Sequence, residues 1–152
     1  MVWYNGGKLR ILNASHAEAI DLVADTINVA LMKTSYTINI DTTGHEHFDD
    51  VSASEIVATN YVVFGGGTEA ALASKAVAAD DTNDRAEFDA QDLTYSNIGN
   101  GSNDTFDQII IYKDTATAST SSLIAHATVN STTTNGSSIT LQWDAQGILQ
   151  LS

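Results

Sequence analysis

Four short runs of β-branched, aliphatic and aromatic residues follow one another in the last third of the chain. They cover residues 105–114, 122–129, 138–144 and 147–152, and the connectors between them are rich in Thr, Ser, Asn and Gly. Runs of this length with turn-forming separators are typical of antiparallel β-structure. The sequence therefore predicts an all-β domain, an antiparallel β-sandwich of which a jelly-roll arrangement is one form.

The rest of the chain supplies further strand-like segments and no boundary between domains. Alternating or compactly apolar stretches predict strands at residues 28–33, 36–41, 57–64, 73–79, 85–89 and 92–96. A chain of 152 residues without an interdomain linker fits one domain of ordinary size. We therefore expect a single β-sandwich domain over residues 13–152. An extended N-terminal arm at residues 1–12, with the flexible sequence Asn5-Gly-Gly, precedes it.

Two segments are compatible with more than one conformation. In residues 14–25, Ser15 and Glu18 have the spacing of a capping box, which begins a helix, but a loop and a short strand fit equally well. Residues 68–79 are rich in alanine and have high helix propensity. Because residues 73–79 precede an acidic turn and a second strand-like run, a strand is favoured there. The three glycines at residues 65–67 permit a sharp chain reversal before this segment.

Charge and cysteine content exclude several classes of function. The formal net charge is −13, and all of it arises after residue 33. Such a surface repels phosphates, so no direct nucleic-acid partner is expected. No cysteine is present for a disulfide framework or a thiolate zinc site. No apolar run approaches the roughly 20 residues that span a bilayer, and no signal peptide is apparent.

Motifs for catalysis and metal binding are weak. His45, Glu46 and His47 are followed by Asp49, and on a strand the two histidines would point to one face, as metal ligands do. The helical spacing that pairs two histidine ligands with a general base is missing, so a polar surface loop is favoured. The acidic run from Asp80 lacks the glycine and glutamate of a calcium-binding loop. We expect no catalytic residue, no cofactor and no bound metal.

The first residues of the chain combine aromatic, aliphatic and basic side chains. Aromatic and arginine side chains dominate the energetics of protein interfaces. The predicted docking surface therefore consists of Trp3, Tyr4, Lys8, Leu9, Arg10 and Ile11. The alternative is that Trp3 and Tyr4 fold back onto the core of their own chain. Trp143 lies in a strand-like run and is expected to pack in the core.

An ordered set of motifs over residues 20–152 resembles a family of small virion proteins from tailed bacteriophages. The motifs lie at residues 25–31, 35–37, 47–52, 65–67, 88–95, 111–125 and 134–148. None is diagnostic by its chemistry, and their order along nearly the whole chain carries the resemblance. The sequence at Asn60-Tyr-Val and the alanine-rich residues 70–79 depart from the pattern.

The resemblance implies a structural component of the phage particle, with no catalytic residues to carry over. The first expectation is a capsid decoration (cement) protein, which binds the major capsid protein on the exterior of the virion and stabilises the shell. A dimer or trimer on the capsid is expected, with no membrane partner. One alternative is a tail, head–tail or carbohydrate-binding host-recognition component. A second is a metal-dependent hydrolase that uses His45, His47 and Asp49.

Overall fold

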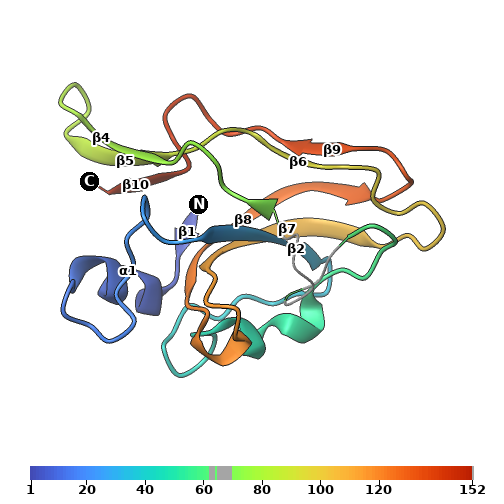
Figure 1. Ribbon diagram of the computed structural model, residues 1–152, viewed down its shortest axis with the longest axis horizontal. Coiled ribbons are helices and arrows are strands. Elements are labelled where there is room, and N and C mark those ends of the chain that lie inside the picture. Colours follow the sequence, from blue (N-terminus) through green and yellow to red (C-terminus); the bar gives the residue numbers. More distant parts are fainter. Residues whose placement is uncertain (62–63, 65–69, 152) are drawn as a thin grey trace.

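Two layers of antiparallel β-structure make up most of the protein. The computed structural model describes residues 1–61, 64 and 70–151. One layer is a five-stranded sheet with the order β1-β8-β7-β2-β3 (Figure 1). Its strands are β1 (Val2–Trp3), β2 (Ile27–Lys33), β3 (Ala70–Ala71), β7 (Thr105–Lys113) and β8 (Leu123–Thr133). All of its strand pairs are antiparallel.

The second layer consists of two smaller sheets that cover one face of the five-stranded sheet. One has the order β10-β5-β4 and the other pairs β6 with β9 (Figure 1). Their bounds are β4 (Ala76–Asp80), β5 (Arg85–Asp89), β6 (Leu93–Tyr95), β9 (Ile139–Leu141) and β10 (Leu149–Leu151). The predicted antiparallel β-sandwich is therefore confirmed.

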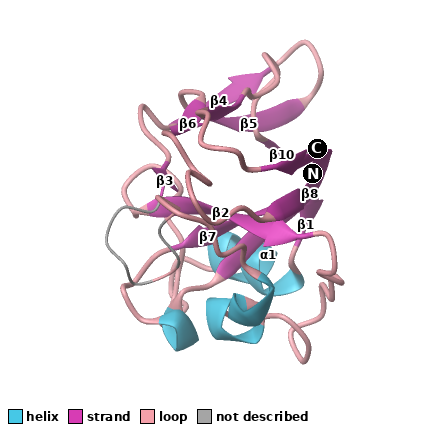
Figure 2. Ribbon diagram, turned by 90° about the vertical axis from the view of Figure 1, so that its right-hand side faces the viewer, coloured by secondary structure: helices cyan, strands magenta, loops and turns pink. Residues whose placement is uncertain are grey.

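Helices and loops cover the opposite face of the five-stranded sheet (Figure 2). The α-helix is α1 (Asn5–Leu12), and the three 3₁₀ turns are η1 (Phe48–Asp50), η2 (Ser52–Ser54) and η3 (Ala118–Thr120). A second cluster of buried side chains lies on this face, with Tyr4, Phe48 and Tyr112 among its members. The five-stranded sheet thus has apolar packing on both faces.

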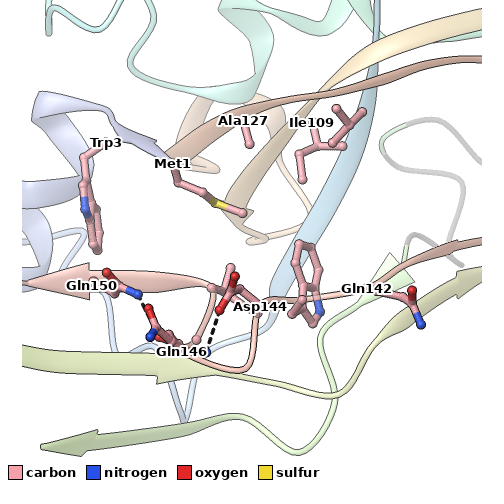
Figure 3. Close-up of a pocket in the computed structure, with 12 residues that line it drawn as sticks. Met1, Trp3, Ile109, Ala127, Gln142, Asp144, Gln146 and Gln150 are labelled. Carbon is pink, nitrogen blue, oxygen red and sulfur yellow. Dashed lines mark hydrogen bonds between the residues drawn. The ribbon is translucent and has the colours of Figure 1, made fainter. Parts of the chain in front are cut away.

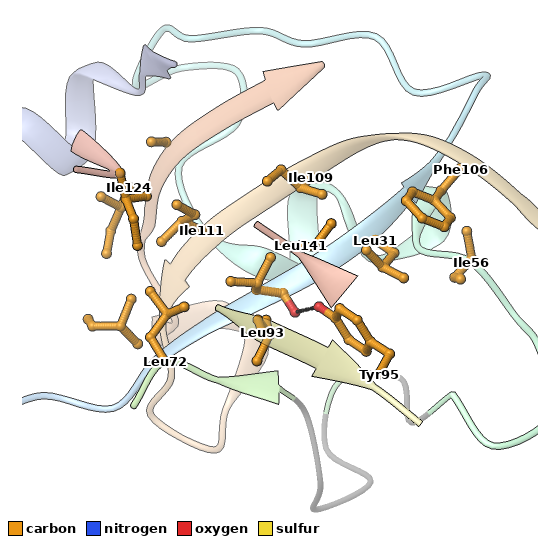
Figure 4. Packing of buried hydrophobic residues seen from close by; sticks show 14 of the residues in the cluster. Leu31, Ile56, Leu72, Leu93, Tyr95, Phe106, Ile109, Ile111, Ile124 and Leu141 are labelled. Atoms are coloured by element: carbon orange, nitrogen blue, oxygen red, sulfur yellow. Dashed lines mark hydrogen bonds between the residues drawn. The ribbon is translucent and has the colours of Figure 1, made fainter. Parts of the chain in front are cut away.

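The central strand β7 connects the two clusters of buried side chains. Ile109 and Ile111 belong to the cluster between the β-layers (Figure 4), and Ile110 and Tyr112 belong to the cluster on the other face. All four side chains are 1% exposed or less. A strand covered on both faces has no solvent side, which explains the uninterrupted Ile-Ile-Ile-Tyr sequence.

Most of the predicted strands are present. The four C-terminal runs form β7, β8, β9 and β10, and the runs at residues 28–33, 85–89 and 92–96 correspond to β2, β5 and β6. The alanine-rich residues 68–79 were compatible with a helix or a strand. Strand β4 begins in this segment and pairs with β5 across an acidic turn, as the favoured interpretation predicts. Gly65–Gly67 lie outside the described residues.

Two predicted strands are absent from the described residues. Residues 36–41 alternate between more and less buried side chains, but they form a loop. Their amides bond to side chains instead of a neighbouring strand: the Asn39 N–H donates to His45 Nδ1 at 3.2 Å and the Asp41 N–H to Asn39 Oδ1 at 3.1 Å. Residues 57–61 are also irregular, and the Val57 N–H donates to Asp104 Oδ2 at 2.9 Å. Residues 62 and 63 lie outside the described residues.

The prediction of an extended arm at residues 1–12 is wrong. Residues 2–3 form a strand at the edge of the large sheet, and residues 5–12 form helix α1. Glycine lowers helix propensity, yet the bare backbone at Gly7 lets the helix lie directly on β8. A Cβ atom at Gly7 would come within 2.8 Å of Ile124 Cα and the Leu123 carbonyl oxygen. Close packing therefore overrides propensity. Residues 14–25 form turns, so the helical alternative fails there.

A buried hydrogen-bond network joins the loop after β2 to the sandwich core. Tyr61 Oη donates to Glu55 Oε1 at 2.7 Å and accepts from the Leu31 N–H at 3.0 Å. Burial raises the pKa of Tyr61 well above its ordinary value, so the phenol stays protonated and able to donate. Glu55 is 3% exposed and also accepts from the Phe64 N–H at 3.1 Å.

Replacing Tyr61 with phenylalanine should destabilise the protein. The Tyr61→Phe variant leaves the Leu31 N–H and one Glu55 oxygen without the phenol, and an unsatisfied buried polar group costs about 1–3 kcal/mol. Chemical denaturation should show a lower free energy of unfolding by about that amount. Val57→Ala, at a position 62% exposed in the same loop, should change it by less than about 0.5 kcal/mol. Equal stabilities of Tyr61→Phe and the parent would contradict this account.

Candidate functional site

The six residues of the predicted docking surface separate into a buried set and an accessible set. Tyr4 is fully buried and Arg10 is 2% exposed, so neither can contact a partner. Trp3 and Ile11 are half-buried, and Lys8 and Leu9 are exposed. The alternative that the aromatic pair folds back onto its own core holds for Tyr4 and in part for Trp3.

Arg10 fixes helix α1 to two loops. Its guanidinium lies 2.6 Å from Glu18 and 2.8 Å from Glu46, and the His47 Nε2 atom lies 3.1 Å from Glu18. Burial alone would raise the pKa of Glu18, but hydrogen bonds from His47 and Arg10 outweigh it and lower that pKa. A Cβ atom at Gly6 would come within 2.6 Å of Arg10 Nη1, so glycine makes room for the guanidinium. Helix α1 is therefore tied to both loops by ion pairs.

Accessible apolar side chains gather where the two ends of the described chain lie side by side, next to α1 (Figure 1). Leu12 is 74% exposed, Leu9 48% and Leu151 43%. Leu12 and Leu151 line one shallow depression together with Trp3, Lys8 and Ile11. We call this surface, made of Trp3, Lys8, Leu9, Ile11, Leu12 and Leu151, the terminal face.

A groove opens between the two β-layers beside the terminal face (Figure 3). It consists of two adjoining hollows of about 550 and 280 Å³ that share Ile109, Val129, Gln142 and Trp143. Ile109, Ala127 and Val129 from β7 and β8 form the apolar side. Polar residues of the segment from β9 to β10 form the other side, and these are Gln142, Asp144, Gln146 and Gln150.

Both tryptophans of the chain line this groove. Trp143 is half-buried and packs partly against the core, in agreement with its predicted location. Its indole Nε1–H donates to the Gln91 carbonyl at 3.0 Å, and its backbone N–H donates to Asp92 Oδ1 at 2.9 Å. The indole and its backbone are thus held in place by hydrogen bonds to residues that do not line the groove.

In the loop that contains His45 and His47, polar side chains form hydrogen bonds that stabilise the loop itself. The ligand atoms of His47, Asp49 and Asp50 lie within 4.8 Å of one another, and His45 is outside this group. Asp50 Oδ2 accepts the N–H groups of Glu46 and His47, at 2.9 and 3.0 Å, and the His47 ring accepts from the Asp50 N–H. Burial raises the pKa of Asp50, but these backbone hydrogen bonds lower it by more. The Asp50 carboxylate therefore caps the start of the η1 turn.

His45 belongs to a separate chain of hydrogen bonds that includes two tyrosines. Tyr36 Oη lies 2.6 Å from Tyr4 Oη and 3.0 Å from His45 Nδ1. Burial raises the pKa of both phenols, so they remain protonated. The structure therefore does not bring together His45, His47 and Asp49, the three residues of the hydrolase alternative.

No known protein family, curated protein or solved structure matches this chain. Among the described residues, no helix has the length and apolar character needed to cross a membrane. The sequence did not predict that Leu12 and Leu151 form part of the terminal face. It also did not predict that three glutamines line the groove. The one signal that could have identified the groove is the alternation of polar residues around Trp143, at Gln142 and Asp144.

Replacing Gly7 with alanine should destabilise the protein although alanine favours helix. The added methyl group would overlap the β8 backbone, and overpacking of this kind costs about 1–3 kcal/mol. Thermal and chemical unfolding should both show the loss. The control is Lys8→Ala, at the next, exposed helix position, which should be neutral or slightly stabilising. A Gly7→Ala protein as stable as the parent would mean that α1 does not lie against β8.

His126 should make stability depend on pH in weakly acidic solution. Burial lowers its pKa, with a further lowering from the N-terminal ammonium group and an opposing effect of Asp107. Below the ordinary histidine pKa of about 6.5, the unfolded chain binds a proton that the folded protein resists, so stability falls as pH falls. The free energy of unfolding should be lower at about pH 5.5 than at about pH 7.5.

A His126→Gln variant should show a smaller difference between these two pH values, measured by urea denaturation. His16→Gln, which changes a histidine outside the sheet, is the matched control. Carboxylates with lowered pKa, such as Glu18 and Asp50, act below this window because their ordinary values lie near 4. An unchanged pH dependence in His126→Gln would rule out this histidine as its source.

Proposed function

We propose that this protein is a structural component of a tailed-bacteriophage particle, a decoration (cement) protein that binds the outer surface of the major capsid protein shell and stabilises it. The order of motifs along residues 20–152 supports the particle assignment. The single structural observation that supports docking is the terminal face, where the exposed Leu12 and Leu151 line a depression between α1 and β10.

The terminal face has the composition of a protein-binding surface. It presents Trp3, three leucines and the cation Lys8 on a body whose net charge is strongly negative. An aromatic anchor among aliphatic side chains with few charges is characteristic of the centre of protein interfaces. The acidic remainder of the surface stays solvated and limits association elsewhere.

Shell stabilisation follows from repetition of a modest contact. Complete burial of a leucine side chain contributes about 1.5–3 kcal/mol, and these leucines are already partly buried, so each contributes less. A copy that contacts two neighbouring capsid subunits opposes their separation. Many such copies on one shell act together, and self-association into a dimer or trimer on the capsid would add to this effect. The proposed mechanism requires no cofactor and no catalytic residue.

Polar substitution of Leu9 and Leu12, the two leucines of α1, should abolish or strongly weaken docking. Shells that lack this protein would be incubated with the purified parent or with Leu9→Ser/Leu12→Ser, and bound copies counted per major capsid protein. The affinity of the double variant should fall by about 10- to 100-fold, which corresponds to about 1.4–2.8 kcal/mol. Point substitutions are preferable to removal of residues 1–11, because that removal would also delete the buried Tyr4 and Arg10.

Val57→Ser, another exposed apolar position outside the terminal face, is the matched control and should bind like the parent. In purified virions, the parent protein should be present at a simple ratio to the major capsid protein. A few copies per particle would contradict the decoration role and favour the tail or head–tail alternative. Unchanged binding of Leu9→Ser/Leu12→Ser would show that docking does not use the terminal face.

A further inference from the structure

We propose that the groove between the two β-layers is a binding site for neutral oligosaccharides, with Trp143 as the stacking surface and Gln142, Asp144 and Gln146 as the polar contacts. This site adjoins the proposed capsid-docking surface and shares Trp3 with it, but none of the four contacts just named belongs to that surface. Its two hollows, of about 550 and 280 Å³, adjoin through shared residues and form one elongated groove. An elongated shape accommodates several linked sugar rings better than a single compact molecule.

The aromatic part of the site is positioned before a ligand arrives. Trp143 is fixed by its hydrogen bonds to Gln91 and Asp92, and it lines both hollows. Figure 3 shows Trp3 above Gln150 at one end of the larger hollow. Sugar rings carry an apolar C–H face that packs on an indole ring, while their hydroxyl groups remain free at the rim. A fixed ring loses little conformational freedom on binding.

The polar part of the site has unused hydrogen-bonding capacity. Gln142 and Gln146 are exposed, and within the described part of the chain their side-chain amides have no hydrogen-bond partner. An amide both donates and accepts, as a sugar hydroxyl does. Asp144 Oδ1 accepts the Gln146 N–H at 2.9 Å, which holds the carboxylate at the rim with its other oxygen available (Figure 3). Gln150, by contrast, already contacts the Gln146 carbonyl and Arg85.

Charge selects against acidic ligands. Asp144 carries the only charged side chain among the described residues that line the two hollows. A phosphate, sulfate or uronate group would find no lysine or arginine among these lining residues, and only the N-terminal ammonium group of Met1 could pair with it, against a net charge of −13 on the whole chain. A neutral, hydroxyl-rich ligand has no such penalty.

The shape of β8 disfavours an added β-strand as the occupant. β1 pairs with β8 only at His126 and Ala125, so the edge of β8 from Ala127 onward borders the groove without a strand partner among the described residues. However, Thr128 pairs with Gln108 and Thr132 with Phe106, so β8 carries extra residues relative to β7 at this point. Such a bulge bends the edge and interrupts the regular ladder that strand addition needs.

Intrinsic tryptophan fluorescence reports on this site, because the chain has two tryptophans and both line the groove, Trp143 without being part of the terminal face. The full-length protein would be titrated with neutral oligosaccharides of glucose, galactose, mannose and N-acetylglucosamine, and with heparin as an acidic probe. We expect a saturable change in emission with at least one neutral oligosaccharide and none with heparin. Gln142→Ala/Gln146→Ala should weaken that affinity at least tenfold, an effect expected when two hydrogen-bonding groups are removed.

The control is Asn100→Ala, which removes an exposed amide outside the groove and should bind like the parent. Leu9→Ser/Leu12→Ser should also retain sugar binding, so failure of this proposal is distinguishable from failure of capsid docking. The proposal is overturned if no neutral oligosaccharide gives a saturable response at about 10 mM, above the roughly 1 mM dissociation constant of a weak site. The proposal is also overturned if Gln142→Ala/Gln146→Ala binds as tightly as the parent. A third contradicting result is tryptophan emission that changes with protein concentration, which would indicate that a second copy of the chain fills the groove.

Discussion

The antiparallel pairing of β7 with β2 on one side and β8 on the other is the interaction on which the rest of the structure depends. β7 contributes buried side chains to both apolar clusters, so the sandwich and the loop-covered face form around the same strand. The second β-layer consists of short strands that have little sheet of their own. Packing against Ile109 and Ile111 on one face of β7 is the main interaction that stabilises these strands.

The two surfaces assigned a role arise where this packing is incomplete. Side chains of the two layers do not fill the space beside Ala127 and Val129, which leaves the groove. The terminal face arises because α1 uses its glycines and Arg10 for internal contacts and leaves its leucines outside. Each surface is thus made of side chains that the fold positions but does not cover. A particle protein with both could be attached to its shell by one surface while the other contacts sugars.

Local pattern predicted the fold well where a strand's own residues determine its packing. The runs of β7, β8 and β10, and the β4–β5 hairpin, combine alternation or continuous apolarity with turn residues at their ends. Pattern failed where partners distant in the sequence decide the structure. The alternation at residues 36–41 reflects partial burial of a loop that bonds to His45, and no property of that segment alone distinguishes it from a strand.

In the N-terminal segment too, partners distant in the sequence decide the structure. Its glycines indicate flexibility when they are considered alone, but Gly7 is required for contact with β8, more than a hundred residues further along the chain, and Gly6 makes room for Arg10. The predicted docking surface included two residues, Tyr4 and Arg10, that face inward. The groove could not be predicted, because it combines β1, β7, β8 and the segment from β9 to β10, and only the tertiary structure brings these together.

The strand order also determines when the chain can fold during its synthesis. β2 leaves the ribosome early, but its long partner β7 ends at Lys113, and β1 must wait for Ala125 and His126. Contacts of such large sequence separation form slowly, and apolar strands exposed in the meantime are prone to aggregation. Ile27–Met32 therefore lack their main sheet neighbour until the chain has been synthesised as far as Lys113. A lower growth temperature or additional chaperones should therefore raise the yield of folded protein.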